Sequence, residues 1–374
     1  MAREAALRAD TAGLSRLLAQ RLIVCVGTGG VGKTTTAAAL ALAAARRGRP
    51  TAVLTVDPSR RLKDALGLDA LASEPRPVPL GGAAAPLDAL ALDTKRTFDQ
   101  LIHRLAPSPA LAERILANRL YQELSSELGG SSEYMAMEKL HELLSLERYA
   151  LIVVDTPPSA DLRELLTAPG RMTELLASQA IQFLKAPSSI LGGSQESGLA
   201  RATLAAVIKA LERWTGMGLL SELADFATGF EQLVDGFRAR AAAIGAALRA
   251  ADTSFAIVTS PEPSTVAASL AFDTELRAGG YPIAGLIANR VYRFPPPAAS
   301  AGSWAAAPLR ARLRENYRDF ARLAQRDDVA LRQLAARTGA PPLAIIPVLE
   351  EPPASLDGLT AIADRLFPAE TRRR

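Results

Sequence analysis

Residues 27–35 read GTGGVGKTT and have the residue types and spacing that a polyphosphate-binding loop requires. Glycines let consecutive backbone N–H groups turn toward a polyphosphate, and the start of a following helix adds the positive end of its dipole. Gly27, Gly32, Lys33 and Thr34 meet the spacing G-x-x-x-x-G-K-[ST]. We expect Lys33 to reach the β- and γ-phosphates and the Thr34 hydroxyl to bind Mg²⁺. The loop therefore predicts nucleotide binding.

Two aspartates follow strand-like apolar runs elsewhere in the chain. Asp57 comes after AVLTV at 52–56, and Asp155 comes after LIVV at 151–154. A carboxylate beside a phosphate loop can orient a water toward the γ-phosphate, and we expect this catalytic role for Asp57, with Lys33. The alternative for Asp57 is to cap the short helix that follows it. We expect Asp155 to hold Mg²⁺, directly or through its water shell.

These functional residues require a scaffold in which strands alternate with helices. Apolar runs typical of strands recur along the chain at residues 22–26, 52–56, 89–92, 151–154, 255–259, 283–288 and 343–346. Segments with helical periodicity separate them, which favours a parallel sheet covered on both faces, with ligands bound beyond the carboxyl ends of the strands. We therefore predict an α/β fold of the P-loop NTPase type, with a mostly parallel sheet of about seven strands and a helical insertion.

The insertion is expected between the strands at 151–154 and 255–259, where the sequence has no convincing strand. Apolar residues recur there at three- and four-residue spacings, which is typical of helices. We predict a nucleotide-binding core formed by residues 1–170 and 251–374 and a helical insertion at 171–250 that binds a client or partner. The apolar side chains of the insertion form either a client-binding surface or a helical core. A second helical block is expected at 108–146.

The composition excludes several classes of site. The net charge is only +4 with acidic and basic residues interspersed, so we expect no nucleic-acid partner. Cys25 is the single cysteine and lies in a strand that buries it, which excludes disulfides and thiolate metal sites made by this chain alone. Neither a signal peptide nor an uncharged run of ~18 residues is present, and we expect a soluble cytoplasmic protein.

In this order, the motifs resemble those of the deviant-Walker ATPases, specifically the family of arsenite-pump ATPases and tail-anchored-protein targeting ATPases. The matching segments are GTGGVGKTTT, TVDPSRRLKDALG, VVDTPPSADLRELL, VTSPEPSTVAASL and the ANR of residues 288–290. The resemblance implies a dimeric, Mg²⁺-dependent ATPase that converts ATP to ADP and phosphate. It also implies that Asp57 positions the attacking water in a first switch loop and that residues 155–159 form the second switch.

The resemblance also implies where the nucleotide binds. Asn289 of the ANR motif should recognise adenine, because an amide can both donate to and accept from the edge of the base. Pro347 should lie against the base. Together with the loop, the expected nucleotide-binding residues are Gly29, Gly30, Val31, Gly32, Lys33, Thr34, Thr35, Asn289, Arg290 and Pro347.

Three departures separate this chain from the best-known members that it resembles. Thr28 stands where the family usually has a lysine that crosses the dimer interface to a partner's phosphates. The arsenite-binding cysteines are absent, which excludes a thiolate-based arsenite pump. The stretch 304–337 has no cysteine, which excludes a homodimer linked by zinc.

Three functional hypotheses follow. The first is an ATPase whose dimer opens and closes to move a helical subdomain, handling a hydrophobic or membrane-protein client. It could form a homodimer, or a heterodimer with a sister ATPase that supplies the missing lysine; alternatively Arg60 and Arg61 could supply the charge in cis. The second is a regulatory subunit that binds nucleotide but hydrolyses it weakly because of Thr28.

The third hypothesis is a membrane- or nucleoid-associated partitioning ATPase. It depends on the C-terminal tail, whose apolar residues could make a basic amphipathic membrane helix. The same spacing fits a terminal helix that docks on the sheet. The apolar residues concerned are Leu356, Leu359, Ile362, Leu366 and Phe367, and the basic ones are Arg365 and Arg372 to Arg374.

Overall fold

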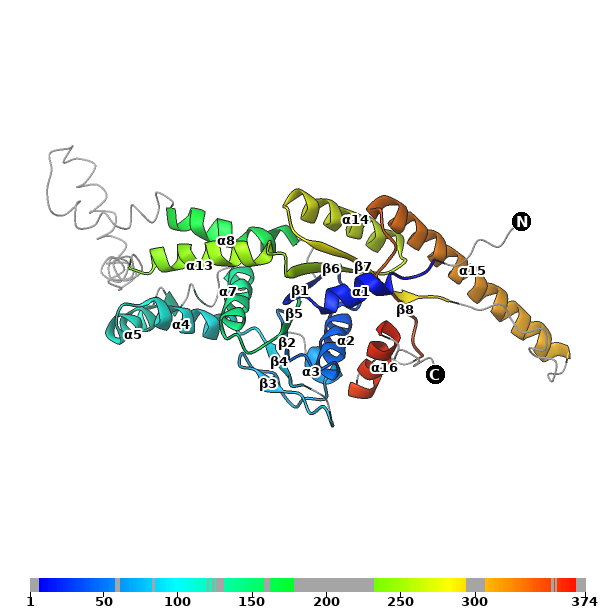
Figure 1. The fold of residues 1–374 in the computed structure, drawn as a ribbon, viewed down its shortest axis with the longest axis horizontal. Helices are drawn as coiled ribbons and strands as arrows, with labels where there is room; N and C mark the ends of the chain where they lie inside the picture. The colour runs from blue at the N-terminus through cyan, green and yellow to red at the C-terminus, as the bar shows by residue number, and fades with distance from the viewer. Residues whose placement is uncertain are drawn as a thin grey trace, which may run out of the picture. The chain divides into compact units, whose positions relative to one another are not determined.

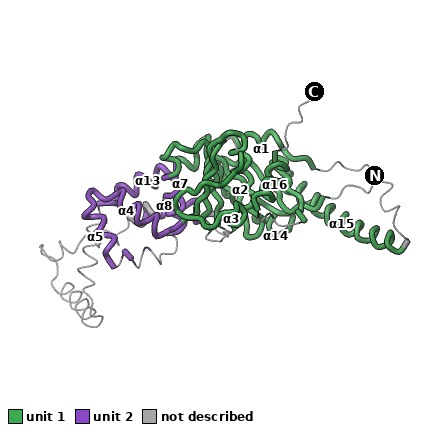
Figure 2. The backbone as a smooth tube through the Cα atoms, turned by 90° about the horizontal axis from the view of Figure 1, so that it is seen from below, with its two compact units in different colours: residues 1–92, 143–162, 247–374 green, residues 93–142, 163–246 purple. Residues whose placement is uncertain are grey.

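Two compact units make up the chain in the computed structural model (Figure 2). Unit 1 comprises residues 1–92, 143–162 and 247–374, and unit 2 comprises residues 93–142 and 163–246. The structure describes residues 7–57, 61–82, 85–119, 121–122, 125, 131–157, 162–177, 232–293, 307–350, 353 and 355–367.

Unit 1 contains an eight-stranded sheet with the order β3-β4-β2-β5-β1-β6-β7-β8 (Figure 1). All neighbouring strands pair in parallel except β3 and β4, which are antiparallel. The strands are β1 (Leu22–Val26), β2 (Thr51–Thr55), β3 (Arg76–Pro77), β4 (Leu87–Ala91), β5 (Leu151–Asp155), β6 (Thr253–Thr259), β7 (Ile283–Val291) and β8 (Ala344–Pro347). The prediction of a mostly parallel α/β sheet is confirmed.

Continuous apolar sequence explains the central strands. Every residue of β1, β2, β5 and β6 is buried, as expected where helices cover both faces of a parallel sheet. All seven expected strands are present within a few residues of their predicted bounds. The eighth strand, β3, was not predicted because its two exposed residues, Arg76 and Pro77, have no apolar pattern.

Helices cover each face of this sheet (Figure 1). Helix α2 (Lys33–Arg46) follows β1, and its alanines let it lie close to the strands: eleven of its residues are buried. Helices α1 (Thr11–Leu18) and α16 (Leu356–Leu366) join α2 in one hydrophobic core. Helix α14 (Pro263–Ala278) packs on β6 and β7, and α15 (Ala307–Thr338) packs on α14. Unit 1 also contains the short helix α3 (Arg61–Ala65).

The C-terminal tail docks on unit 1. Leu359, Ile362 and Leu366 of α16 are buried against the core that contains α2, and Phe367 is buried beside them under the guanidinium of Arg47. The alternative of a membrane-binding tail is therefore wrong, because the apolar face it needs is already covered. No helix among the described residues is both long and apolar enough to cross a bilayer.

Unit 2 is helical in the residues that the structure describes. Its helices include α4 (Thr94–Leu105), α5 (Pro109–Ala117) and most of α7 (Ser131–Ser145), α8 (Leu162–Ala177) and α13 (Val234–Leu248). Most of the expected insertion at 171–250 lies outside the described residues, because residues 178–231 are not described. Whether its apolar residues form a surface or a core stays untested.

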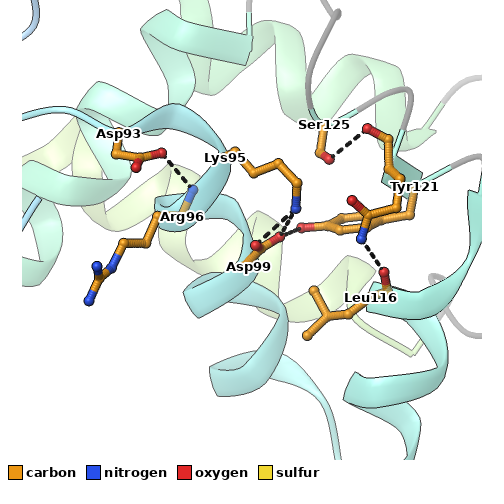
Figure 3. A network of polar contacts seen from close by, with 8 residues as sticks. Asp93, Lys95, Arg96, Asp99, Leu116, Tyr121 and Ser125 are labelled. Carbon is orange, nitrogen blue, oxygen red and sulfur yellow. Dashed lines mark hydrogen bonds and ion pairs between the residues drawn. The ribbon is translucent and has the colours of Figure 1, made fainter.

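A polar network inside unit 2 fixes the chain that follows α5 (Figure 3). The Asp99 carboxylate accepts hydrogen bonds from the Tyr121 hydroxyl at 2.6 Å and from Lys95 Nζ at 2.9 Å. The Tyr121 ring also packs on Phe98, which contacts Phe237 of α13. Burial beside the Asp99 carboxylate raises the pKa of Tyr121, so its hydroxyl stays protonated and keeps donating.

Candidate nucleotide-binding site

The strand order brings the predicted site residues to one edge of the sheet. Each of these residues or loops lies at or near the carboxyl end of one strand. In the order β2, β5, β1, β6, β7 and β8, they are Asp57, Asp155, the glycine loop, residues 260–262, Asn289 and Pro347. The three central strands end at nearly the same level, because Asp155 of β5 pairs with Cys25 of β1 on one side and with Thr55 of β2 on the other. Motifs that are far apart in sequence thus meet where parallel sheets bind ligands.

Gly32 gives the loop its shape. It adopts a left-handed conformation with φ of 93° and serves as the N-cap of α2. A methyl group at this position would overlap the amide nitrogen of Asn289, so the backbone conformation and the space both require glycine. The first turn of α2 therefore begins at Lys33 with its N–H groups at the edge where the other site residues converge.

Lys33 is held under the loop. Its side chain is buried, and Nζ donates a hydrogen bond to the carbonyl oxygen of Thr28 at 2.9 Å. Burial lowers the pKa of Lys33, and the negative charges of Asp155 and Asp57 oppose that shift. The ammonium group of Lys33 therefore lies near both carboxylates, and its hydrogen bond to the Thr28 carbonyl oxygen restrains it against the glycine loop.

Asp155 is the last residue of β5 and is fully buried. Its Oδ2 accepts a hydrogen bond from the Thr55 hydroxyl at 3.0 Å, while Oδ1 has no hydrogen-bond partner among the described residues. Burial raises the pKa of Asp155 to about 6, against the opposing effects of the Thr34 and Thr55 hydroxyls and of Lys33. A buried carboxylate oxygen without a partner, close to the Thr34 hydroxyl, is a donor set that fits Mg²⁺.

Asp57 follows β2 and is partly exposed. Its charge acts on both Lys33 and Asp155, so its carboxylate lies near these two side chains. The charge of Arg61, at the start of α3, also acts on Lys33. Residues 58–60 lie outside the described residues, so the alternative of a helix cap for Asp57 is not tested, and Arg60 cannot be placed.

A pocket of about 410 Å³ adjoins the loop. Its lining residues are Gly32, Thr35, Ser260, Pro261, Glu262, Asn289, Arg290, Tyr292, Arg326, Pro347, Val348, Leu349, Glu350, Pro353 and Ile362. Every residue that was expected beside the base therefore lines one cavity. Its size and its mixture of apolar and polar walls suit a nucleoside.

Asn289 is positioned by two hydrogen bonds. Its Nδ2 donates to the carbonyl oxygen of Val31 at 2.8 Å, and its Oδ1 accepts from the backbone N–H of Arg290 at 2.9 Å. Arg290 has a positive φ of 57°, which bends the chain at this point. Each side of the amide keeps one further hydrogen-bonding site, a second N–H on Nδ2 and a second lone pair on Oδ1, for a ligand.

The structure adds site residues that sequence reasoning missed. Thr55 bonds Asp155 from the neighbouring strand, and Arg326 of α15 lines the pocket. Asp327 is fully buried and accepts hydrogen bonds from the backbone N–H of Tyr292 at 2.8 Å and from Arg326 Nη2 at 2.9 Å. An acid at a helix position that should face the core was the available signal for Asp327.

The predicted residues group as follows. Lys33, Thr34, Asp57 and Asp155 lie together, whereas the pocket collects the residues expected near the base. Gly29 and Gly30 are exposed at the turn of the loop, and Val31 is buried beneath it. The roles of these residues toward nucleotide and metal stay predictions.

Known proteins resemble this chain along much of its length. A sequence model of the family described as anion-transporting ATPase matches residues 20–303. Over 158 residues the chain is 34% identical to the uncharacterized protein SCO2128 of Streptomyces coelicolor, which covers 42% of this chain and 39% of that protein.

Two further relatives have ATPase in their names. ATPase ASNA1 homolog 1 of Paramecium tetraurelia is 30% identical over 175 residues, covering 46% of this chain and 51% of that protein. ATPase GET3B of Arabidopsis thaliana is 26% identical over 292 residues, covering 73% and 64%. The chain thus spans between 39% and 64% of the length of these relatives.

Proposed function

This chain belongs to the family of anion-transporting ATPases, and from that premise we propose that it hydrolyses ATP to ADP and phosphate at the loop of residues 27–35. The observation that carries the proposal is the convergence of a buried lysine, a helix-start threonine and a buried aspartate at one sheet edge. Lys33, Thr34 and Asp155 lie behind the glycine loop as a P-loop ATPase requires.

Each residue has a defined task in this proposal. The loop N–H groups and Lys33 bind the phosphates, and Thr34 with Asp155 holds Mg²⁺, which neutralises charge on the β- and γ-phosphates when bound. Asp57 orients the attacking water. Asn289 binds the adenine edge through its remaining N–H and lone pair. Pro347 lies against the base, and Arg290 forms part of the pocket wall.

We propose further that nucleotide binding opens and closes a dimer and so moves the helical subdomain, which handles a hydrophobic or membrane-protein client. The resemblance to tail-anchored-protein targeting ATPases supports this output. Arsenite is not the substrate in this proposal, because thiolate ligands are lacking. Cys25 is the only cysteine, it is fully buried, and burial raises the pKa of its thiol.

Calorimetric titration with Mg-ATP tests the binding half of the proposal. Lys33→Ala removes the loop's ammonium and is expected to weaken binding at least about a hundredfold, the loss of roughly one strong charge-assisted contact. Lys95→Ala serves as the control, because Lys95 belongs to the network of unit 2. Near-normal affinity in a folded Lys33→Ala variant would refute the assignment of the site.

A second candidate function is a regulatory subunit that binds nucleotide but turns it over slowly. Thr28 favours it, because the threonine side chain has no charge to offer a partner's phosphates. If a partner chain normally supplies the lysine, the isolated chain is slow and a lysine-bearing sister ATPase restores hydrolysis. If Arg61 acts in cis, the isolated chain is fast and Arg61→Ala slows it.

One assay distinguishes the two candidate functions. Phosphate release is measured for the isolated wild-type chain, for Thr28→Lys and for Arg61→Ala. Slow wild-type turnover that rises in Thr28→Lys supports the regulatory or heterodimeric form. Rapid wild-type turnover that collapses in Arg61→Ala defeats it and supports a homodimer or monomer with the charge supplied in cis.

A further inference from the structure

Arg326 of α15 lies in the wall of the pocket that is expected to hold the nucleoside. Its side chain is 53% exposed, and it lines the cavity of about 410 Å³ together with Asn289 and Pro347. Lys33 and Asp155, which are expected near the β- and γ-phosphates, do not line this cavity. Arg326 therefore belongs to the nucleoside end of the site and not to its phosphate end.

One buried carboxylate holds the guanidinium group of Arg326. Asp327 Oδ1 accepts hydrogen bonds from Arg326 Nε at 3.1 Å and from Nη2 at 2.9 Å. Asp327 Oδ2 accepts a hydrogen bond at 2.8 Å from the backbone N–H of Tyr292, three residues beyond Asn289. Because Asp327 is 0% exposed, its charge needs these partners. The guanidinium group is thus fixed relative to the stretch of chain that carries Asn289.

The other edge of the guanidinium group keeps its donors. An arginine has five N–H groups, and two of those of Arg326 donate to Asp327. The others, on Nη1 and Nη2, have no hydrogen-bond partner in the part of the chain that the structure describes. A smaller cavity of about 290 Å³ also borders Arg326, but most of its walls are apolar, so the larger pocket suits a ligand with hydrogen-bond acceptors better.

We propose that Arg326 is a further nucleotide-binding residue, which donates hydrogen bonds to the nucleoside part of the ligand, and that Asp327 is the residue that positions it. This role rests on the proposed function, because it requires a nucleotide in the pocket. The base and the sugar of a nucleotide carry ring-nitrogen and hydroxyl acceptors that a guanidinium edge can bind. Since Asp327 holds the side chain before the ligand arrives, little rotamer freedom is lost on binding.

Calorimetric titration of the full chain with Mg-ADP tests the role of Arg326. Arg326→Gln removes the charged fork and is expected to weaken Mg-ADP binding about tenfold, the loss of roughly one charge-assisted hydrogen bond. Arg322→Gln is the matched control and should bind as wild type does. Arg322 lies one turn earlier on the same helix, pairs with Asp319 at 3.1 Å and does not line the pocket. Equal affinity of wild type and Arg326→Gln would overturn the proposal.

A comparison of two nucleotides tests the placement of Arg326 at the nucleoside. Mg-ATP and Mg-ADP share the nucleoside, so Arg326→Gln should weaken the binding of both by the same factor. A loss confined to Mg-ATP would place Arg326 at the γ-phosphate and would contradict the proposal.

A double-mutant cycle tests whether Asp327 acts through Arg326. Asp327→Asn keeps an acceptor for the N–H of Tyr292 but lacks the charge that holds Arg326, and it is expected to weaken Mg-ADP binding at least about threefold. The double variant with Arg326→Gln should bind no more weakly than Arg326→Gln alone. Losses that add would mean that Asp327 acts by fixing the end of β7, and its positioning role would be wrong.

Arg326→Lys tests the same positioning in a chain that keeps Asp327. Lysine retains the positive charge but lacks the planar fork, so it cannot both pair with Asp327 through two N–H groups and present a fixed edge to the ligand. Weaker Mg-ADP binding than in wild type is therefore expected. Wild-type affinity in this variant would show that an unoriented charge is sufficient and would refute the role of Asp327.

Failure of the role of Arg326 and failure of the proposed function give different results. Asn289→Ala, titrated in parallel, removes the amide assigned to the base. If Asn289→Ala weakens Mg-ADP binding while Arg326→Gln binds normally, the nucleotide site stands and only the role of Arg326 is wrong. If wild type does not bind Mg-ADP, the nucleotide site and the role of Arg326 are both wrong.

Discussion

Replacement of Asp155 by asparagine should change how the stability of the metal-free protein depends on pH. Asp155 is fully buried, and one of its carboxylate oxygens has no hydrogen-bond partner among the described residues. Burial raises its pKa from 3.8 to about 6. The folded state therefore holds this proton more tightly than the unfolded chain does.

The sign and size follow from proton linkage. Between about pH 4 and pH 6 the folded protein binds more protons at this site than the unfolded chain, so the free energy of unfolding falls as the pH rises. A shift of about two pKa units corresponds to about 3 kcal/mol at pH 7 and above, to less than about 1 kcal/mol at pH 4, and to nothing below about pH 3. Asparagine cannot ionise, so the variant should lack this loss.

Urea unfolding in EDTA at a series of pH values measures the effect. Compared with wild type, Asp155→Asn should gain about 2 kcal/mol between pH 4 and pH 7.5, whatever fixed cost the amide itself has. Asp57→Asn, which removes a partly exposed carboxylate nearby, controls for the loss of one negative charge. Parallel stability curves for wild type and Asp155→Asn would refute the reasoning. Mg-ADP should stabilise wild type but not this variant.

Three further substitutions test the packing of unit 1 by urea unfolding. Gly32→Ala should lower the free energy of unfolding by more than about 1 kcal/mol and weaken nucleotide binding, because alanine is strained at positive φ and overlaps Asn289. An unchanged midpoint of urea unfolding would contradict this. Leu359→Ala should cost about 2–5 kcal/mol, since this fully buried leucine joins α16 to the core, and a cost below 1 kcal/mol would argue against tight docking of the tail. Tyr149→Phe should cost about 1.5–3 kcal/mol, because its hydroxyl donates to the buried Asp88 carboxylate at 2.7 Å; a neutral result would mean that water replaces it.

Local sequence was sufficient for the sheet and the loop. Strands such as β1 and β5 are continuous apolar runs, which a parallel sheet covered on both faces can bury. Because ligands bind beyond the carboxyl ends of the strands in such sheets, Asp57 and Asp155 were expected beside the loop. The glycine spacing predicted a loop in which Gly32 indeed needs a positive φ. These features depend on residues that are adjacent in the sequence, so local sequence patterns are enough to predict them.

Features that depend on tertiary contacts were not predictable in the same way. The spacing of Leu359, Ile362 and Leu366 fits a membrane helix as well as a docked helix, and only the alanine surface of α2 decides between them. The position of Asp327 on the core-facing side of its helix marks it as unusual, but the sequence does not show that its partner is a backbone N–H thirty-five positions earlier. Pairings of this kind are set by the fold.

The central claim is that Lys33, Thr34, Asp57 and Asp155 form a site for Mg²⁺-dependent ATP hydrolysis. Phosphate release from ATP, measured for the purified chain with Mg²⁺ and with EDTA, tests it most directly, with Asp57→Asn in parallel. The account predicts release that needs Mg²⁺ and that falls at least about a hundredfold in Asp57→Asn while Mg-ATP affinity changes little. Release that is unaffected by EDTA, or an Asp57→Asn variant as active as wild type, would contradict it.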